Sequence, residues 1–363
     1  MAKSKSKVLV GMSGGVDSSV AAALLVRQGF EVVGGFIKNW SDTKDLATGE
    51  CAWKGERRDA MRVAARLGIP LVTFDFEKAY RRKVVDALFR DYAKGVTPNP
   101  DVLCNEEIKF GLFLQEARKL GCGFVATGHY ARLKRDTDGA AHLLRGLDPD
   151  KDQSYFLYRV PQTALRHTLF PIGRLKKPQV RTLARRLKLP VAEKPDSQGI
   201  CFIGKLDMVA FLRKKIPSKP GDIVDEEGRV LGRHGGLDGY TVGQRQRILV
   251  AKGGEPWFVA DKDIEGNRLM IVQGAGHPKL FSSGIEIADL HWAGGKQPSY
   301  PQACAVQVRY RQDPVQASLV SGRGKRAKIE FKRPVKAVAL GQSAVIYKGA
   351  ECLGGGIITD RYN

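Results

Sequence analysis

The stretch VLVGMSGGVDSSVAAALLVR, residues 8–27, decides the fold of the first part of the chain. Its apolar start, Val8 to Val10, predicts a buried strand, and Ser18 to Arg27 predicts a helix that Gly29 ends. Two glycines in the loop between them let backbone amides approach a ligand, and the helix N-terminus adds partial positive charge. The loop is neither a Walker A motif nor GxGxxG. It predicts a phosphate-binding turn; a glycine turn that is merely capped by Asp17 or Ser18 is the alternative.

Strands and helices alternate through the residues that follow. The expected strands are 31–37, 71–74 and 124–127, and the expected helices are 56–67, 77–92 and 108–120. Such alternation is typical of an α/β fold with a Rossmann-like parallel sheet and helices on both faces. Ligands of these sheets bind beyond the C-terminal ends of the strands.

The pattern changes after about residue 206. Pro217 and Pro220 mark a linker, and short strands rich in glycine extend from there to about residue 277. The last segment shows repeated strands separated by turn residues, which favours a small all-β barrel or sandwich. We therefore expect a pyrophosphate-loop catalytic domain over 1–206, a small central domain over 207–277 and a C-terminal β-barrel over 278–363.

Positive charge is in excess and unevenly distributed. The 363 residues carry 60 Lys+Arg against 38 Asp+Glu, and residues 174–188 hold seven basic side chains and no acidic one. A polyanionic partner would account for this excess, although a merely basic surface remains open. A helix from Pro178 would place Arg181 and Arg185 one turn apart, where their like charges repel and lower helix stability. Binding of a phosphate backbone would relieve this repulsion.

The sequence contains no membrane or secretion signal. No apolar run approaches the roughly 18 residues of a membrane span, and residues 1–7 lack the apolar core of a signal peptide. A cytoplasmic protein is expected. None of its six cysteines forms a CxxC pair, which argues against a clustered zinc site, and each is by default a reduced thiol.

Two cysteines have settings that suggest chemistry. Cys104 follows the proline-stiffened run 98–103, where we expect a helix to begin near Asn105 and to lower the thiol pKa. Cys201 follows the turn 196–200 within the most basic stretch, where Lys194 and Lys205 would favour the thiolate. For both, a buried structural cysteine is an equally good interpretation from these residues alone.

SGGVDSS at 13–19 resembles the loop of enzymes that cleave ATP between its α and β phosphates to adenylate an oxygen. Over nearly its whole length the chain resembles the tRNA-specific 2-thiouridylase (MnmA/TrmU) family of this pyrophosphate-loop ATPase superfamily. The runs that carry this resemblance are GMSGGVDSS (11–19), KNW (38–40), TPNPDVLCNEEIKFG (97–111), ATGHY (126–130), LLRGLDPDKDQSYFLY (143–158), FPIG (170–173), KPQVR (177–181), DSQGICFIG (196–204), GQR (243–245), RYRQ (309–312) and CLGGGII (352–358).

The resemblance implies a reaction and its catalytic residues. ATP would adenylate O2 of the wobble uridine, and a persulfide on Cys201 would deliver sulfur to C2. Cys104 would then attack the Cys201 sulfur to close a disulfide, or assist sulfur release, as AMP leaves. Covalent catalysis of this kind divides one difficult step into easier ones. Asp17 would help to bind Mg²⁺ or assist proton transfer, and no other metal site is implied.

The resemblance also implies binding residues. The ATP-binding set is Gly11, Met12, Ser13, Gly14, Gly15, Val16, Asp17, Ser18, Ile37 and Gly128. Asn99, Pro100 and Asp101 would face the flipped target base, and tRNA would contact His129, Lys151, Asp152, Gln153, Arg309, Tyr310 and Gln342. His129 has the alternative of a loop histidine with a hydrogen-bonding role. Tyr155, Phe156 and Tyr158 are better explained as a core stripe than as base-stacking residues.

The implied partners are tRNAs for Lys, Glu and Gln and a persulfide donor such as a cysteine desulfurase or a sulfur relay carrier. We expect a monomer. Two alternatives are a different adenylating enzyme, such as an amidotransferase-linked synthetase or a tRNA lysidine synthetase, and a tRNA-binding protein without catalysis. The first would not need Cys104 and Cys201 as a pair, and the intact SGGVDSS loop argues against the second.

Overall fold

The first part of the chain builds a five-stranded parallel sheet. The computed structural model describes residues 6–41, 51–196, 208–248, 250 and 253–362. The strands lie in the order β3-β2-β1-β4-β7, and all neighbouring pairs run parallel. Their bounds are β1 Lys7–Gly11, β2 Glu31–Lys38, β3 Leu71–Asp75, β4 Phe124–Ala126 and β7 Thr168–Leu169. The expected α/β class is confirmed, and β7 adds an edge strand that the sequence pattern did not indicate.

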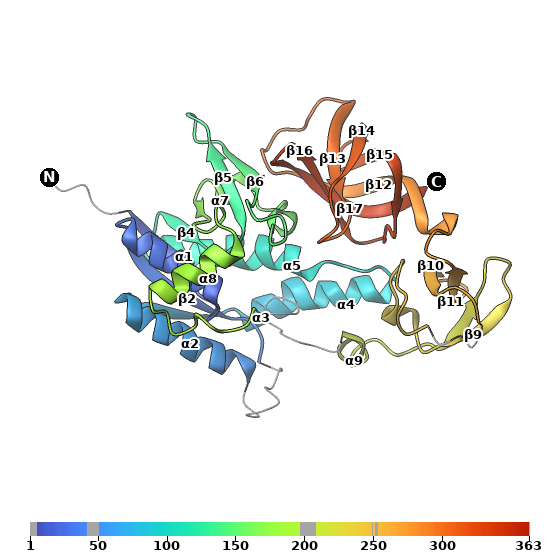
Figure 1. Cartoon of the computed structure of the whole chain (residues 1–363), viewed down its shortest axis with the longest axis horizontal. Helices are drawn as coiled ribbons and strands as arrows, with labels where there is room; N and C mark the ends of the chain where they lie inside the picture. Colours follow the sequence, from blue (N-terminus) through green and yellow to red (C-terminus); the bar gives the residue numbers. More distant parts are fainter. Residues whose placement is uncertain (1–5, 42–50, 197–207, 249, 251–252, 363) are drawn as a thin grey trace.

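Helices cover both faces of this sheet (Figure 1). Val8 and Val10 pack with one group of helices and Leu9 with the other, because successive side chains of a strand point to opposite faces. The first group is α1 Val16–Arg27, α2 Ala52–Leu67 and α8 Lys177–Arg186. The second is α3 Glu77–Tyr80, η1 Arg81–Val85, α4 Asp86–Ala93, α5 Pro100–Leu103, η2 Cys104–Leu112 and α6 Phe113–Lys119. Within the described residues, no helix is long and apolar enough to cross a membrane.

The helix that carries Cys104 begins earlier than expected. The sequence predicted a start near Asn105, but α5 begins at Pro100 and continues through η2, a π-helical segment, into α6. Proline suits the first helical position because its fixed φ fits the helix and its missing N–H has no partner to lose there. Cys104 therefore lies in the second helical turn rather than at the helix N-terminus.

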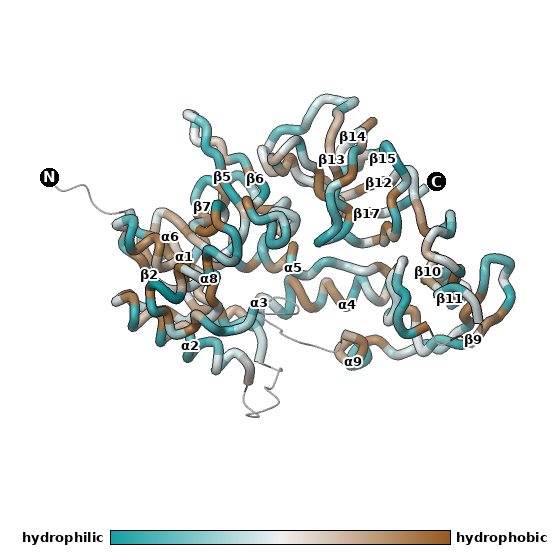
Figure 2. The backbone as a smooth tube through the Cα atoms, in the orientation of Figure 1, coloured by the Kyte–Doolittle hydropathy of each residue, from teal (hydrophilic) through white to brown (hydrophobic). Residues whose placement is uncertain are grey.

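Two β structures follow the parallel sheet. A four-stranded sheet, in the order β10-β11-β8-β9, comprises β8 Gly221–Val224, β9 Val230–His234, β10 Trp257–Asp263 and β11 Arg268–Gln273. A six-stranded barrel, closed by pairing of β12 with β17, comprises β12 Phe281–Trp292, β13 Gln302–Gln307, β14 Val315–Arg323, β15 Arg326–Lys336, β16 Ser343–Lys348 and β17 Glu351–Tyr362. Figure 2 shows apolar, brown stretches in these strands and a polar, teal tip on the hairpin beside them. The expected C-terminal all-β barrel is confirmed.

That hairpin joins the barrel to the first part of the chain. It consists of β5 Ala131–Arg135 and β6 Ala141–Arg145, and β6 extends the barrel sheet by pairing Leu144 with Glu351 of β17. His142 on β6 lies between two carboxylates, with Nε2 2.7 Å from Asp136 and Nδ1 2.7 Å from Glu351. These hydrogen bonds, that to Glu351 foremost, raise the pKa of His142.

Buried polar contacts also connect the barrel to the helices below the sheet. Tyr155 and Tyr158 are fully buried, which confirms the prediction that they are core residues. The Tyr155 hydroxyl donates to the carbonyl of Ser343 at 2.9 Å. Arg159 contacts Glu106 of η2 and Asp289 of β12 with the same guanidinium. Its side chain is only 16% exposed, so this ion pair is partly desolvated.

The remaining short helices are η3 Ser154–Phe156, α7 Gln162–Leu165, α9 Met208–Leu212, η4 Leu237–Gly239 and η5 Pro278–Leu280.

Replacing His142 with Gln should destabilise the protein in a pH-dependent way. Because the native pKa is raised, the stabilisation is fully present below the unfolded value of about 6.5 and is lost as pH rises through the native pKa. The difference in melting temperature between wild type and H142Q should therefore be largest near pH 6 and shrink toward pH 9. His167→Gln, which removes a histidine bound only to a backbone carbonyl, is the control. A difference that does not vary over this range would contradict the assignment.

Replacing Arg159 with Met should lower the free energy of unfolding by about 2–3 kcal/mol, because Glu106 would remain partly buried without its partner. Arg185→Met is the matched control, since the pair of Arg185 with Glu193 is exposed to water and should change stability little. Chemical denaturation of both variants measures the difference. Equal effects would show that the Arg159 contacts contribute no more than a surface pair.

Candidate active site

The loop between β1 and α1 has the geometry of an anion site. Gly14 has φ +72°, and a Cβ there would collide with the carbonyl of Glu56 in α2. A Cβ on Gly128 would lie 2.6 Å from the amide nitrogen of Ser18. Both positions therefore need glycine for close approach of backbone to backbone. The loop is thus held between α2 and the end of β4 at the C-terminal edge of the sheet.

The first amides of α1 are oriented toward this loop. The first helical hydrogen bond runs from Ser19 N to Gly15 O at 3.3 Å, so the amides of Val16, Asp17 and Ser18 precede any intrahelical partner. The hydroxyls of Ser18 and Ser19 both donate to Gly15 O, at 3.2 and 2.7 Å. They stabilise the turn, which leaves backbone amides and the helix dipole as the groups that would bind phosphate.

Asp17 lies in a network of charged groups. Lys177, at the start of α8, places its Nζ 2.8 and 2.9 Å from the two Asp17 oxygens, and the Tyr130 hydroxyl donates to Asp17 at 2.9 Å. Burial, together with the Asp17 charge, raises the pKa of Tyr130 and keeps it a hydrogen-bond donor. Asp17 thus accepts three hydrogen bonds, two of which form its ion pair with Lys177. Its expected role with Mg²⁺ or in proton transfer stays a prediction.

Lys177 also reaches Asp196, the last described residue before segment 197–207. Its Nζ lies 2.7 Å from Asp196, which is also 2.8 Å from Lys151 and 2.7 Å from Arg181. Although partial burial works in the opposite direction, the hydrogen bonds from Lys151 and Lys177 hold the pKa of Asp196 well below its usual range. Cys201 lies outside the described residues, in segment 197–207, which directly follows Asp196 in the sequence.

The argument that phosphate relieves repulsion between Arg181 and Arg185 is wrong. The chain after α8 folds back along the helix, where Arg181 contacts Asp196 and Arg185 contacts Glu193. Two carboxylates of the chain itself therefore offset the like charges. On the face of the helix that packs against the core, Val180 and Ala184 are fully buried.

Cys104 is fully buried, as the structural alternative for this residue describes. Since it follows one complete helical turn, its thiol does not lie beside the helix N-terminus as the sequence predicted. Asn99 occupies the N-cap position of α5, but its side chain makes no capping hydrogen bond and interacts with the phenol of Tyr155 instead. Next to it, Gln342 donates to the carbonyls of Thr97 at 2.9 Å and Pro98 at 3.3 Å. A barrel loop thus fixes the segment that leads into Asn99, Pro100 and Asp101.

The other residues expected to contact tRNA differ in accessibility. His129 is buried, its Nδ1 is 2.7 Å from the Thr127 hydroxyl, and burial followed by the charge of Lys109 depresses its pKa. Asp152 accepts from Arg145 at 2.7 Å. The side chain of Gln153 accepts from the Tyr130 amide at 3.0 Å. These contacts favour a structural, hydrogen-bonding role for all three in this conformation.

The barrel contributes two further expected residues. Arg309 is exposed, and the ring centroid of Tyr310 lies 4.3 Å from that of Phe156. Ile37 is buried in β2, and Met12 lies beneath the glycine loop. The expected residues therefore form two groups: one around Asp17, Gly128 and Lys151, and one around Asn99, Gln342 and Tyr310.

Sequence reasoning missed three residues of the site. Lys177 was noted in the basic stretch and in the KPQVR run, but no local signal in the sequence points to its contact with Asp17. Tyr130 ends the ATGHY run, but the run gave it no role in the site. Asn39, directly after β2, is 1% exposed, and neither of its amide atoms has a hydrogen-bond partner among the residues that the structure describes. A buried unpaired amide is costly and calls for a ligand or a rearranged partner.

Metal ligation is not built into the described residues. No group of three or more His, Cys, Asp or Glu side chains that could hold a metal occurs among them. Mg²⁺ accompanying a nucleotide needs only one or two carboxylates besides phosphate and water. Asp17 fits that requirement in chemistry and position, provided that the ion replaces one of its contacts with Lys177.

Three family models match the chain in succession. They are the tRNA methyl transferase HUP domain over residues 6–205, the tRNA methyl transferase PRC-barrel domain over 209–273 and the aminomethyltransferase beta-barrel domain over 282–358. Among solved structures, NMN synthetase from Francisella tularensis is 20% identical and covers 53% of this chain and 66% of its own, with a TM-score of 0.34. A 4-thiouridine synthetase–RNA complex with bound ATP is 13% identical over 58% of this chain and 50% of its own, also with a TM-score of 0.34. Neither likeness bears on function.

Curated relatives match the whole chain. The tRNA-specific 2-thiouridylase MnmA of Enterococcus faecalis is 46% identical over 99% of this chain and 96% of its own length. That of Streptococcus sanguinis is 46% identical with the same coverage, and that of Yersinia pestis is 45% identical over 99% and 97%. The matched region includes the loop, the helical run with Cys104 and the barrel alike. The chain belongs to the family of tRNA-specific 2-thiouridylases.

Proposed function

We propose that this protein is an ATP-dependent sulfurtransferase that converts a uridine of tRNA into 2-thiouridine. The observation that carries the proposal is the contact of Lys177 with both Asp17 and Asp196, which joins the anion-binding loop to the segment that contains Cys201. ATP bound at the adenylating loop and the sulfur-carrying cysteine must act on the same carbonyl group, ATP on its oxygen and sulfur on its carbon. This ion network supports their operation as one site.

The first step is adenylation. O2 of the target uridine attacks the α-phosphorus of ATP, a new P–O bond forms, and the bond to the β-phosphate breaks with loss of pyrophosphate. The amides that open α1 and the glycines at 14 and 128 suit binding of the phosphates. Mg²⁺ held by Asp17 and phosphate oxygens would supply charge neutralisation. Lys177 orients Asp17 and offsets its charge when the polyanionic nucleotide enters.

Sulfur transfer follows. The terminal sulfur of a persulfide on Cys201 attacks C2, and AMP leaves with the original O2. The Cys104 thiolate then attacks Sγ of Cys201, which breaks the S–S bond to the transferred sulfur and leaves 2-thiouridine and a Cys104–Cys201 disulfide. A dithiol reductant restores the thiols. Cys104 is fully buried in this conformation, so this step requires a local rearrangement of its helical run.

The remaining features of the proposal concern partners and organisation. We propose tRNAs for Lys, Glu and Gln as substrates, modified at the wobble position, and a cysteine desulfurase or sulfur relay carrier as persulfide donor. The protein acts as a cytoplasmic monomer. Its domains comprise residues 1–206, 207–277 and 278–363. Asn99, Pro100 and Asp101 face the flipped uridine, while Arg309, Tyr310 and Gln342 contribute from the barrel side.

Incubation with unmodified tRNA, Mg-ATP and a persulfide donor tests the proposed reaction. Nucleoside digestion and mass spectrometry should detect 2-thiouridine, together with one AMP per thiolation. An absence of the thionucleoside with a donor that is active on a known 2-thiouridylase would refute it.

Cys104→Ser and Cys201→Ser should each abolish 2-thiouridine, because each removes a sulfur that the transfer requires. ATP binding should survive in both, since neither side chain belongs to the glycine loop. Cys51→Ser, at a half-exposed position outside both cysteine motifs, is the control and should retain normal turnover. Normal turnover in either of the first two variants would show that its cysteine has been assigned wrongly.

Lys177→Met should weaken ATP binding by at least tenfold and thiolation more strongly. Without the lysine, Asp17 faces the nucleotide phosphates without its cationic partner, whereas Asp196 keeps its contacts with Lys151 and Arg181. Lys176→Met is the matched control, because the neighbouring Lys176 side chain is exposed. Equilibrium dialysis with ATP, followed by thiolation kinetics, measures both effects. Unchanged ATP affinity in Lys177→Met would contradict the role given to this residue.

A further inference from the structure

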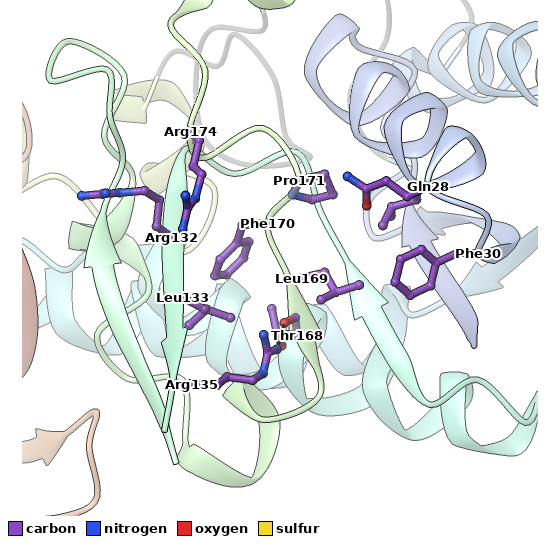
Figure 3. Close-up of a pocket in the computed structure, with 11 residues that line it drawn as sticks. Gln28, Phe30, Arg132, Leu133, Arg135, Thr168, Leu169, Phe170, Pro171 and Arg174 are labelled. Carbon is purple, nitrogen blue, oxygen red and sulfur yellow. Dashed lines mark hydrogen bonds between the residues drawn. The ribbon is translucent and has the colours of Figure 1, made fainter. Parts of the chain in front are cut away.

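A hollow of about 250 Å³ lies at the far end of α1 from the glycine loop. It is formed by the end of α1, by β5 and by the segment that runs from β7 to Arg174 (Figure 3). Since α1 has 12 residues at 1.5 Å each, the hollow is about 18 Å from the loop. It is therefore separate from the site of adenylation.

Three arginines and no acidic residue line this hollow. Arg132 donates from Nε to the Arg145 carbonyl at 2.7 Å, and Arg135 donates to the Thr168 carbonyl at 2.5 Å. Backbone carbonyls orient these guanidinium groups but do not neutralise them. The third, Arg174, is exposed at the rim.

These three differ from the arginines of this part of the chain that pair with acidic side chains. Arg145, Arg159 and Arg181 each have a carboxylate within 3 Å, whereas the arginines of the hollow have none among the residues that the structure describes. Partial burial of the Arg135 guanidinium lowers its pKa, a shift that an anion beside it would oppose. The hollow thus presents uncompensated positive charge in oriented forks, a geometry that suits phosphate.

The base of the hollow is apolar. Phe30, Leu169 and Phe170 line it and are only partly buried. Figure 3 shows the ring of Phe170 between Arg174 and Leu133, and that of Phe30 on the opposite side near Gln28. Aromatic faces next to arginine forks are the combination that binds single nucleotides of RNA, by stacking on the base and pairing with the phosphate.

We propose that this hollow binds one nucleotide of the tRNA at a position remote from the uridine that is modified. The inference rests on the proposed function only in taking tRNA as the bound RNA. An acidic peptide would satisfy the arginines but would make no use of the aromatic base. The site would contribute to tRNA affinity and register without taking part in the chemistry.

Arg174→Gln tests this site without risk to the fold, because the side chain is exposed. It should weaken tRNA binding about five- to thirtyfold at fixed salt and reduce the slope of log K against log salt concentration by about one. Arg135→Gln/Arg174→Gln should lower the slope further. Arg268→Gln is the control, since Asp263 at 2.9 Å already neutralises Arg268. An Arg174→Gln slope equal to that of the control would overturn the proposal.

A photo-crosslinker at Gln28 gives a direct readout. Gln28 is exposed at the rim, and benzoylphenylalanine in its place should crosslink to one tRNA nucleotide other than the target uridine. The absence of any RNA crosslink would overturn the proposal. If millimolar UMP abolishes the crosslink while tRNA affinity is unchanged, the proposal also fails, and the hollow is a site for free nucleotides.

Thiolation kinetics separate this inference from the proposed function. Arg174→Gln should raise the KM for tRNA and leave kcat unchanged. If wild-type protein makes no 2-thiouridine but still crosslinks to tRNA through position 28, the function fails and the site stands. If thiolation proceeds and KM for Arg174→Gln equals the wild-type value, the site fails and the function stands.

Discussion

The bridge that Lys177 makes between Asp17 and Asp196 is the interaction on which the rest of the site depends. The three side chains come from the start of α1, the start of α8 and the chain beyond α8, so the ion pairs fix three separate segments at one point. A lysine only 13% exposed between two carboxylates is stable because each charge compensates the desolvation of the others. When the negatively charged phosphates of a nucleotide bind at the start of α1, the contacts among these three charged side chains must change.

The barrel completes the other half of the site. Gln342 holds the chain that leads into Asn99, Ser343 accepts from Tyr155, and Arg159 ties the π-helical segment of Cys104 to β12. The contacts of Gln342 with Thr97, of Tyr155 with Ser343 and of Arg159 with Asp289 each join residues that are more than 100 positions apart in the sequence. The environment of Cys104 is therefore set by residues that a view of the first part alone would not include.

Much of the fold was predictable from the sequence, because strand and helix periodicities and glycine loops are local signals. The parallel sheet, the barrel and the burial of Tyr155 and Tyr158 all followed from such patterns. The helix start at Pro100 was missed, since the proline was interpreted as a loop residue. The partners of Arg181 and Arg185 were missed because they depend on where the following chain folds. Lys177 and Asn39 became visible only when charge pairing and unpaired buried atoms were known in three dimensions.

The strand pairing between β6 and β17 has a consequence for how this protein can be divided. Leu144 and Glu351 pair across two units that the family models separate, so β6 has an open edge whenever the barrel is removed. Unpaired strand edges are templates for aggregation. A fragment cut between the units would expose that edge together with the buried tyrosines. If the barrel were lost during evolution, another element would have to pair with the exposed edge of β6. This constraint favours retention of the hairpin and the barrel together.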